Sequence, residues 1–186
     1  MSRGFRVHLV RHGEAAASWD TAPDPALSAE GARQAAEVGA LLSKGSRAAL
    51  WSSPLRRARE TAQPLADAWA APVLVEDRVR ELPSAGVPME SRRSWLKAVM
   101  QARWDAVEAP LQEWRAEAWR ALCAVEHDVV VFTHFMVINA IVSRATDDAR
   151  TVCFEPDYCS VTTLSLADGE LHLETLGRER PTLINL

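Results

Sequence analysis

Two histidines follow predicted strands at the points where those strands end. The apolar runs at residues 5–10 and 128–132 have the length and composition of buried strands, and a single residue separates them from His12 and His134, respectively. Parallel strands bring their carboxyl ends together at one edge of a sheet, where ligands bind. If the two strands are neighbours, the imidazoles therefore meet at that edge, with Arg11 beside them.

A group of arginines opens the helix that is predicted to start at the Ser-Ser-Pro sequence of residues 52–54, with serine as its cap and proline in its first turn. Arg56, Arg57 and Arg59 lie in its first turns, where the helix dipole disfavours each cation by about 0.3–1 kcal/mol. A bound anion would remove this conflict, because a helix N-terminus presents free N–H groups and guanidinium forks match phosphate oxygens. A second helix N-terminus is predicted beside the second histidine, at residues 136–144. These features favour a pocket that binds a phosphoryl group and attacks it.

Short apolar strands alternate with amphipathic helices along the chain. The pattern predicts strands at 5–10, 48–51, 72–75, 128–132, 159–166 and 170–176. It predicts helices at 29–44, capped by Ser28, and at 54–69, 91–104, 111–125 and 136–144, with a kink or an early break at Pro64 in the second. This order indicates an α/β fold: a three-layer α/β/α sandwich with a mainly parallel central sheet and an antiparallel C-terminal edge strand.

Composition and charge narrow the class of protein. The chain has 186 residues, of which 48% are hydrophobic and 25% charged. These values are typical of one folded domain and exclude disordered, collagen-like and coiled-coil proteins. A formal net charge of −4 provides no general attraction to nucleic acid or to an anionic membrane, so we expect neither as a partner.

The cysteines and the N-terminal residues indicate the cellular compartment of the protein. Cys123, Cys153 and Cys159 are odd in number and lack CxxC spacing, which favours reduced thiols over a disulfide framework or a zinc site. The apolar run at residues 5–10 is too short for a signal peptide or a membrane span. We therefore expect a cytoplasmic protein.

Six motifs occur in an order that is known from one protein family. They extend over nearly the whole chain, and the first and third are the most specific. The chain resembles the histidine phosphatase superfamily, in particular its phosphoglycerate mutase-like members, in the motifs LVRHGE at 9–14, LSAEGARQA at 27–35, SPLRRARETA at 53–62, VREL at 79–82, TH at 133–134 and CSVTTL at 159–164.

The resemblance implies a phosphoglycerate mutase-like fold and a role for each site residue. His12 would attack phosphorus and form a phosphohistidine that water or an acceptor then removes. Arg11, Arg57 and His134 would hold the phosphoryl oxygens and neutralise the charge of the transition state. Glu81 would protonate the leaving oxygen and then activate water, which requires a raised pKa. No metal and no cofactor are implied.

The sequence departs from the family pattern beside both the second histidine and the predicted acid. Phe135 and Met136 replace a pair of glycines and Asn139 stands where arginine is common, so we expect a bulkier pocket rim and a narrower approach. The loop at 82–86 also differs from the family sequence. Glu76 and Asp77 are therefore retained as alternatives to Glu81 for the acid.

We expect a single histidine phosphatase domain over residues 1–186, with a short helical lid at about 83–125. The predicted activity is a metal-independent phosphomonoesterase acting on a small phosphorylated molecule, with a phosphoprotein as the other substrate class. Three alternatives stay open: a phosphoglycerate mutase-type phosphotransferase, a protein phosphohistidine phosphatase and a non-catalytic phospholigand-binding module. The sequence does not indicate an oligomeric state.

Overall fold

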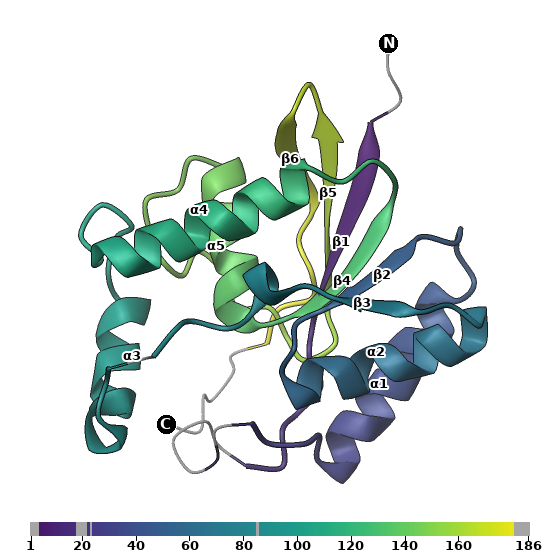
Figure 1. Ribbon diagram of the computed structural model, residues 1–186, viewed down its shortest axis with the longest axis horizontal. Coiled ribbons are helices and arrows are strands. Elements are labelled where there is room, and N and C mark those ends of the chain that lie inside the picture. Colours follow the sequence, from purple (N-terminus) through teal and green to yellow (C-terminus); the bar gives the residue numbers. More distant parts are fainter. Residues whose placement is uncertain (1–3, 18–21, 23, 85, 181–186) are drawn as a thin grey trace.

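The computed structural model describes residues 4–17, 22, 24–84 and 86–180. Its strands and helices alternate as the sequence predicts (Figure 1). The strands are β1 (Phe5–Arg11), β2 (Ala49–Ser52), β3 (Val73–Val75), β4 (Val129–Thr133), β5 (Val161–Ala167) and β6 (Glu170–Thr175). The helices are α1 (Ala29–Leu42), α2 (Arg56–Trp69), α3 (Arg92–Met100), α4 (Ala109–Cys123) and α5 (Phe135–Ala145), with short 3-10 turns η1 (Asp77–Val79) and η2 (Met89–Ser91).

The six strands form one sheet in the order β3-β2-β4-β1-β5-β6. β3, β2, β4 and β1 are parallel, whereas β5 runs antiparallel to both β1 and β6. The predicted mainly parallel sheet with an antiparallel C-terminal hairpin is therefore confirmed. Residues Arg11 and Thr133 are paired at the ends of β1 and β4, so the residues that follow these two strands lie next to each other.

Helices cover both faces of the sheet, with α1 and α2 on one side and α4 and α5 on the other (Figure 1). The alternation of β4 explains this arrangement, because Val130 and Phe132 pack in the cluster beneath α1 and α2 while Val129 and Val131 pack in the cluster with α4 and α5. All four are essentially inaccessible to solvent, and each such side chain contributes roughly 1.5–3 kcal/mol to folding. The three-layer architecture follows from strands that are apolar on both faces.

Two details of α2 are decided by contacts with other segments. The helix continues through Pro64 and ends at Trp69, so of the two outcomes that we expected at Pro64, a kink or an early break, the early break does not occur. Pro64 lies against α1, where a Cβ atom on Gly39 would come within 2.9 Å of the proline ring, so close packing of the two helices outweighs the cost of the missing hydrogen bond. Ser53 also does not cap the helix, because Leu55 is the N-cap residue. The Ser53 hydroxyl accepts the N–H of Leu55 at 3.2 Å and is hydrogen-bonded to His134 at 2.7 Å.

The helix predicted at 91–104 ends early, at Met100. Trp104 leaves the helical path because its backbone N–H donates to Ala149 O at 2.8 Å and its indole N–H donates to Ser143 Oγ at 2.8 Å. These contacts come from residues about forty positions away, which local helical periodicity does not report. Among the helices of the described residues, none combines the length and the apolar character that a membrane span requires.

Candidate active site

The predicted site residues meet at the carboxyl ends of β1 and β4. The backbone N–H of His12 donates to Thr133 O at 2.9 Å, which locks the two strand ends together. The imidazole rings of His12 and His134 lie 5.2 Å apart between centroids, and both side chains are buried. The structure therefore brings together two residues that are separated by more than a hundred positions.

The hydrogen bonds of His12 define its tautomer. Nδ1 lies 2.7 Å from the carbonyl oxygen of Gly13, and because a carbonyl only accepts, the ring proton is on Nδ1. Nε2 is then unprotonated and accepts from Arg57 Nε at 3.1 Å. Burial, reinforced by the charges of Arg57 and Arg11, holds the pKa of His12 well below its ordinary value of 6.5. The ring therefore presents a lone pair on Nε2 at neutral pH.

Two glycines and a threonine set the position of His12. The N–H of Gly13 donates to Thr61 Oγ1 at 3.0 Å, and the same hydroxyl donates to Arg57 O at 2.6 Å, which ties the end of β1 to the first turns of α2. A Cβ atom on Gly13 would lie 2.6 Å from Gly31 O. Only the absence of side chains at both glycines allows the loop to lie this close to α1.

The two predicted arginines are both buried beside His12. Arg11 donates from Nη1 to Pro156 O at 2.8 Å, and burial lowers its pKa. Arg57 uses Nε for His12, while its Nη1 is buried and has no hydrogen-bond partner among the residues that the structure describes. A buried guanidinium N–H without an acceptor is costly, and a phosphoryl oxygen is an acceptor suited to it.

His134 is completely buried at the N-terminus of α5. Its Nε2 is hydrogen-bonded to Ser53 Oγ at 2.7 Å, and no partner of its Nδ1 lies in the described part of the chain. Burial and the charge of Arg57 place the pKa of His134 well below the ordinary value of 6.5. His134 thus offers another buried polar atom, and its imidazole interacts electrostatically with Arg57.

Glu81 faces this group of residues. Its carboxylate accepts the N–H of Leu82 at 3.1 Å and that of Met136 in the first turn of α5. Burial raises the pKa of Glu81, and the charges of Arg57 and Arg11 oppose that rise only in part. Glu81 thus has the neighbours and the direction of pKa shift that a general acid requires.

The alternative carboxylates have other partners. Glu76 accepts from Arg78 at 2.6 Å and caps the η1 turn, and this pairing lowers the pKa of Glu76. Asp77 is exposed and pairs with Arg80 at 2.8 Å. Glu81 therefore interacts with the site arginines Arg57 and Arg11, whereas Glu76 and Asp77 are paired with Arg78 and Arg80.

Comparison with known proteins identifies the family. The family model of the histidine phosphatase superfamily, branch 1, matches residues 7–179. The chain belongs to this superfamily. A curated relative, "Probable phosphoglycerate mutase GpmB" of Erwinia tasmaniensis, is 33% identical over 117 residues, which is 60% of this chain and 48% of the relative. The match thus spans about half the length of that protein.

Solved structures of histidine phosphatases and mutases share the fold. The mycobacterial glucosyl-3-phosphoglycerate phosphatase superposes with a TM-score of 0.74 at 21% identity, covering 95% of this chain and all of that one. Phosphoglycerate mutase from Bacillus anthracis superposes with a TM-score of 0.70 at 16% identity, covering 94% of this chain and 93% of that one. The phosphoglycerate mutase-like fold is therefore established.

The site also contains an aromatic residue that our sequence reasoning missed. The ring of Tyr158 lies 4.0 Å from the guanidinium carbon of Arg11 and 6.0 Å from the ring of His12. Phe135 lies near the same guanidinium, at 5.2 Å. The one available signal was that Tyr158 is the only tyrosine in the chain and directly precedes the CSVTTL motif.

The residues that depart from the family pattern lie mostly in the core. Met136 is 2% exposed and packs in the cluster with α4, so Met136 does not contribute to the bulkier rim that we expected, whereas Phe135 lies over Arg11. Asn139 is fully buried and accepts the N–H groups of Cys153 and Phe154 at 2.9 and 3.2 Å. Asn139 therefore anchors the segment that leads to Tyr158 and does not line the phosphate pocket.

Proposed function

We propose that this protein is a metal-independent phosphomonoesterase that acts through a phosphohistidine formed on His12. The observation that carries the proposal is the buried, neutral imidazole of His12, whose Nε2 lone pair points to Arg57 Nε at 3.1 Å. A nucleophile with a depressed pKa, next to guanidinium groups, suits attack on an anionic phosphorus centre.

In the first step, His12 Nε2 forms a bond to phosphorus while the bond from phosphorus to the leaving oxygen breaks. Arg11, Arg57 and His134 would bind the three remaining phosphoryl oxygens, and preorganised donors of this kind contribute about 10²–10³-fold each to the rate. Protonated Glu81 would supply the proton that the leaving oxygen takes up. Burial supports this role, since it raises the pKa of Glu81.

In the second step, ionised Glu81 would take a proton from a water molecule whose oxygen attacks phosphorus. The bond between His12 and phosphorus breaks, the lone pair returns to Nε2 and inorganic phosphate leaves. Glu81 ends the cycle protonated, as it began. A small phosphorylated molecule is the substrate class that we propose, in line with the name of the mycobacterial phosphatase that shares the fold.

A phosphotransferase of the mutase type is the second candidate, because the curated relative is named as a phosphoglycerate mutase. It would share the first step and return the phosphoryl group to a bound acid instead of to water. We also propose that residues 1–186 form one domain with a lid at about 83–125. A cytoplasmic location is proposed from the three free cysteines.

Hydrolysis of an aryl phosphate by wild type and His12→Ala, with and without a chelator, tests the proposal. We expect turnover in wild type that the chelator does not affect and that the variant lacks. Acid-labile, alkali-stable radiolabel on the protein after a quench would identify the phosphohistidine. If folded wild-type protein shows neither turnover nor label, the proposed phosphatase activity is refuted, and a non-catalytic phospholigand-binding module becomes the favoured interpretation. With 3-phosphoglycerate, isomerisation in place of phosphate release would favour the mutase.

A further inference from the structure

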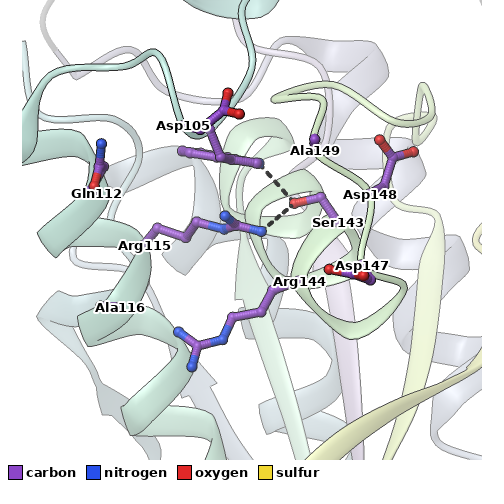
Figure 2. A pocket seen from close by; sticks show the side chains of 10 residues that line it. Asp105, Gln112, Arg115, Ala116, Ser143, Arg144, Asp147, Asp148 and Ala149 are labelled. Carbon is purple, nitrogen blue, oxygen red and sulfur yellow. Dashed lines mark hydrogen bonds between the residues drawn. The ribbon is translucent and has the colours of Figure 1, made fainter.

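A second cavity, of about 460 Å³, lies at the far end of α5 from the active site (Figure 2). Its volume is within the range of small-molecule pockets. The cavity is lined by the middle of α4, the C-terminal end of α5 and the turn at Trp104. Helix α5 has 11 residues and is therefore about 16 Å long, so this cavity is separate from the site at His134.

The wall of the cavity holds one arginine in a fixed position. Arg115 donates from Nε to Ala140 O at 3.1 Å and from Nη2 to Ser143 Oγ at 3.1 Å. Its guanidinium lies 4.4 Å from the centre of the buried Trp104 ring, and Trp104 donates to the same Ser143 hydroxyl. These bonds leave Nη1 of Arg115 for a further acceptor. Because the guanidinium group is already held in place, binding of a ligand costs little side-chain conformational entropy.

A second arginine approaches from the opposite wall. Figure 2 shows Arg115 extending from α4 and Arg144 extending from α5 into the space between the helices. Arg144 lies over the Trp119 ring at 4.5 Å. Throughout the described ranges of the chain, no carboxylate lies within ion-pair distance of either guanidinium. Burial and the charge of Arg144 lower the pKa of Arg115 to about 10. The two positive charges therefore repel each other.

The acidic residues at the rim do not neutralise these two cations. Asp105 pairs with Arg103 at 3.3 Å, and Asp148 pairs with Arg150 at 2.6 Å. Asp147 also lines the cavity and, like Arg144, is exposed to solvent. The cavity therefore has two arginines in its wall, and its rim holds two ion-paired carboxylates and the exposed Asp147.

We propose that this cavity binds a small organic anion through the guanidinium groups of Arg115 and Arg144. Carboxylate and phosphoryl groups share the required chemistry, because both present oxygens in the plane that a guanidinium fork matches. Binding removes the repulsion between the two cations and places the anion where water is partly excluded. Gln112, at the rim, is available to the polar part of such a ligand.

Titration of ¹⁵N-labelled protein with inorganic phosphate, and separately with succinate, tests the site. The Nε–H of Arg115 is hydrogen-bonded at the cavity wall and the Nε–H of Arg57 is hydrogen-bonded in the active site. Their two signals, assigned with Arg115→Lys and Arg57→Lys, report the two sites in one spectrum. We expect the Arg115 signal to shift saturably with a Kd of about 1–10 mM. The stronger of the two probes identifies the preferred anionic group.

Substitution decides whether the arginines bind or merely pack on the tryptophans. Arg144→Gln is expected to weaken the response of the Arg115 signal at least tenfold. Arg120→Gln, on the exposed face of α4 where Arg120 pairs with Glu113, is the matched control and leaves it unchanged. No shift with either probe up to about 50 mM, or an equal shift in Arg144→Gln, overturns the proposal. If Arg144→Gln does not fold, the Trp104 indole N–H signal serves as a second reporter of anion binding. Loss of its anion-induced shift in Arg115→Lys supports the site, and an unchanged shift in that variant overturns the proposal.

Discussion

Replacement of Gly31 by alanine is expected to displace the segment that carries His12. A Cβ atom at position 31 would lie 2.0 Å from Glu14 O and 2.9 Å from the carbonyl carbon and the backbone nitrogen of Glu14. All three are backbone atoms, so no side-chain rotation relieves the overlap. Residues 13 and 14 must therefore move relative to α1, and His12 precedes them directly.

Two opposing effects determine the size of the loss. Inside a helix, alanine is favoured over glycine by about 1 kcal/mol. Overpacking a close contact costs about 1–3 kcal/mol, and more when backbone must shift. Because 2.0 Å is far inside any normal contact distance, overpacking wins, and we expect a net loss of about 1–2 kcal/mol of unfolding free energy. For a chain of this length that lowers the melting temperature by roughly 2–8 °C.

The effect on activity is expected to exceed the effect on stability. A misplacement of about 1 Å at a nucleophile lowers a rate by about 10²-fold. Thermal unfolding and aryl phosphate hydrolysis of Gly31→Ala measure the two losses separately. Gly45→Ala is the control, because its Cβ would meet only Leu42 O at an ordinary 3.4 Å. A Gly31→Ala protein as stable and as active as wild type would show that the close approach of the two segments does not position His12.

Three further predictions concern the site itself. Arg57→Lys is expected to lower kcat about 10²–10³-fold, because an ammonium group cannot both donate to His12 Nε2 and present two N–H groups to the phosphoryl oxygens. Steady-state kinetics on an aryl phosphate measure this loss, and a kcat within threefold of wild type would contradict the prediction. Glu81→Gln is expected to lower kcat about 10²–10⁴-fold and to abolish the alkaline limb of the kcat/KM pH profile, because the free enzyme must hold Glu81 protonated, while Glu76→Gln stays near wild type; the reverse order would transfer the acid role to Glu76. The pKa values of His12 and His134 are depressed in the folded protein, so below about pH 6.5 the unfolded chain binds more protons than the folded one. The free energy of unfolding is therefore expected to fall as the pH decreases through that value, by at most about 1.4 kcal/mol per pH unit for each histidine. Equal free energies of unfolding in urea at about pH 7 and 5.5 would contradict this.

The elements that the sequence predicted best are those with strong local signals. β1 and β4 were found because short aliphatic runs ended at polar residues, and α1 because Ser28 caps it as expected by accepting the Gly31 N–H. The errors occurred where distant residues decided the outcome. Trp104 left its predicted helix for Ser143, and Ser53 bonded His134 instead of capping α2.

The sequence by itself determined the family, the order of strands and helices, and which histidines and arginines stand at strand and helix ends, because motifs and periodicity are local properties of the chain. Tertiary structure alone decided that Glu81 is buried near Arg57 and Arg11, whereas Glu76 and Asp77 pair with Arg78 and Arg80. It also placed Tyr158 against Arg11 at 4.0 Å and lowered the pKa of His12. The physical reason is that burial, distance between charges and hydrogen-bond partners depend on segments that meet only when the chain is folded.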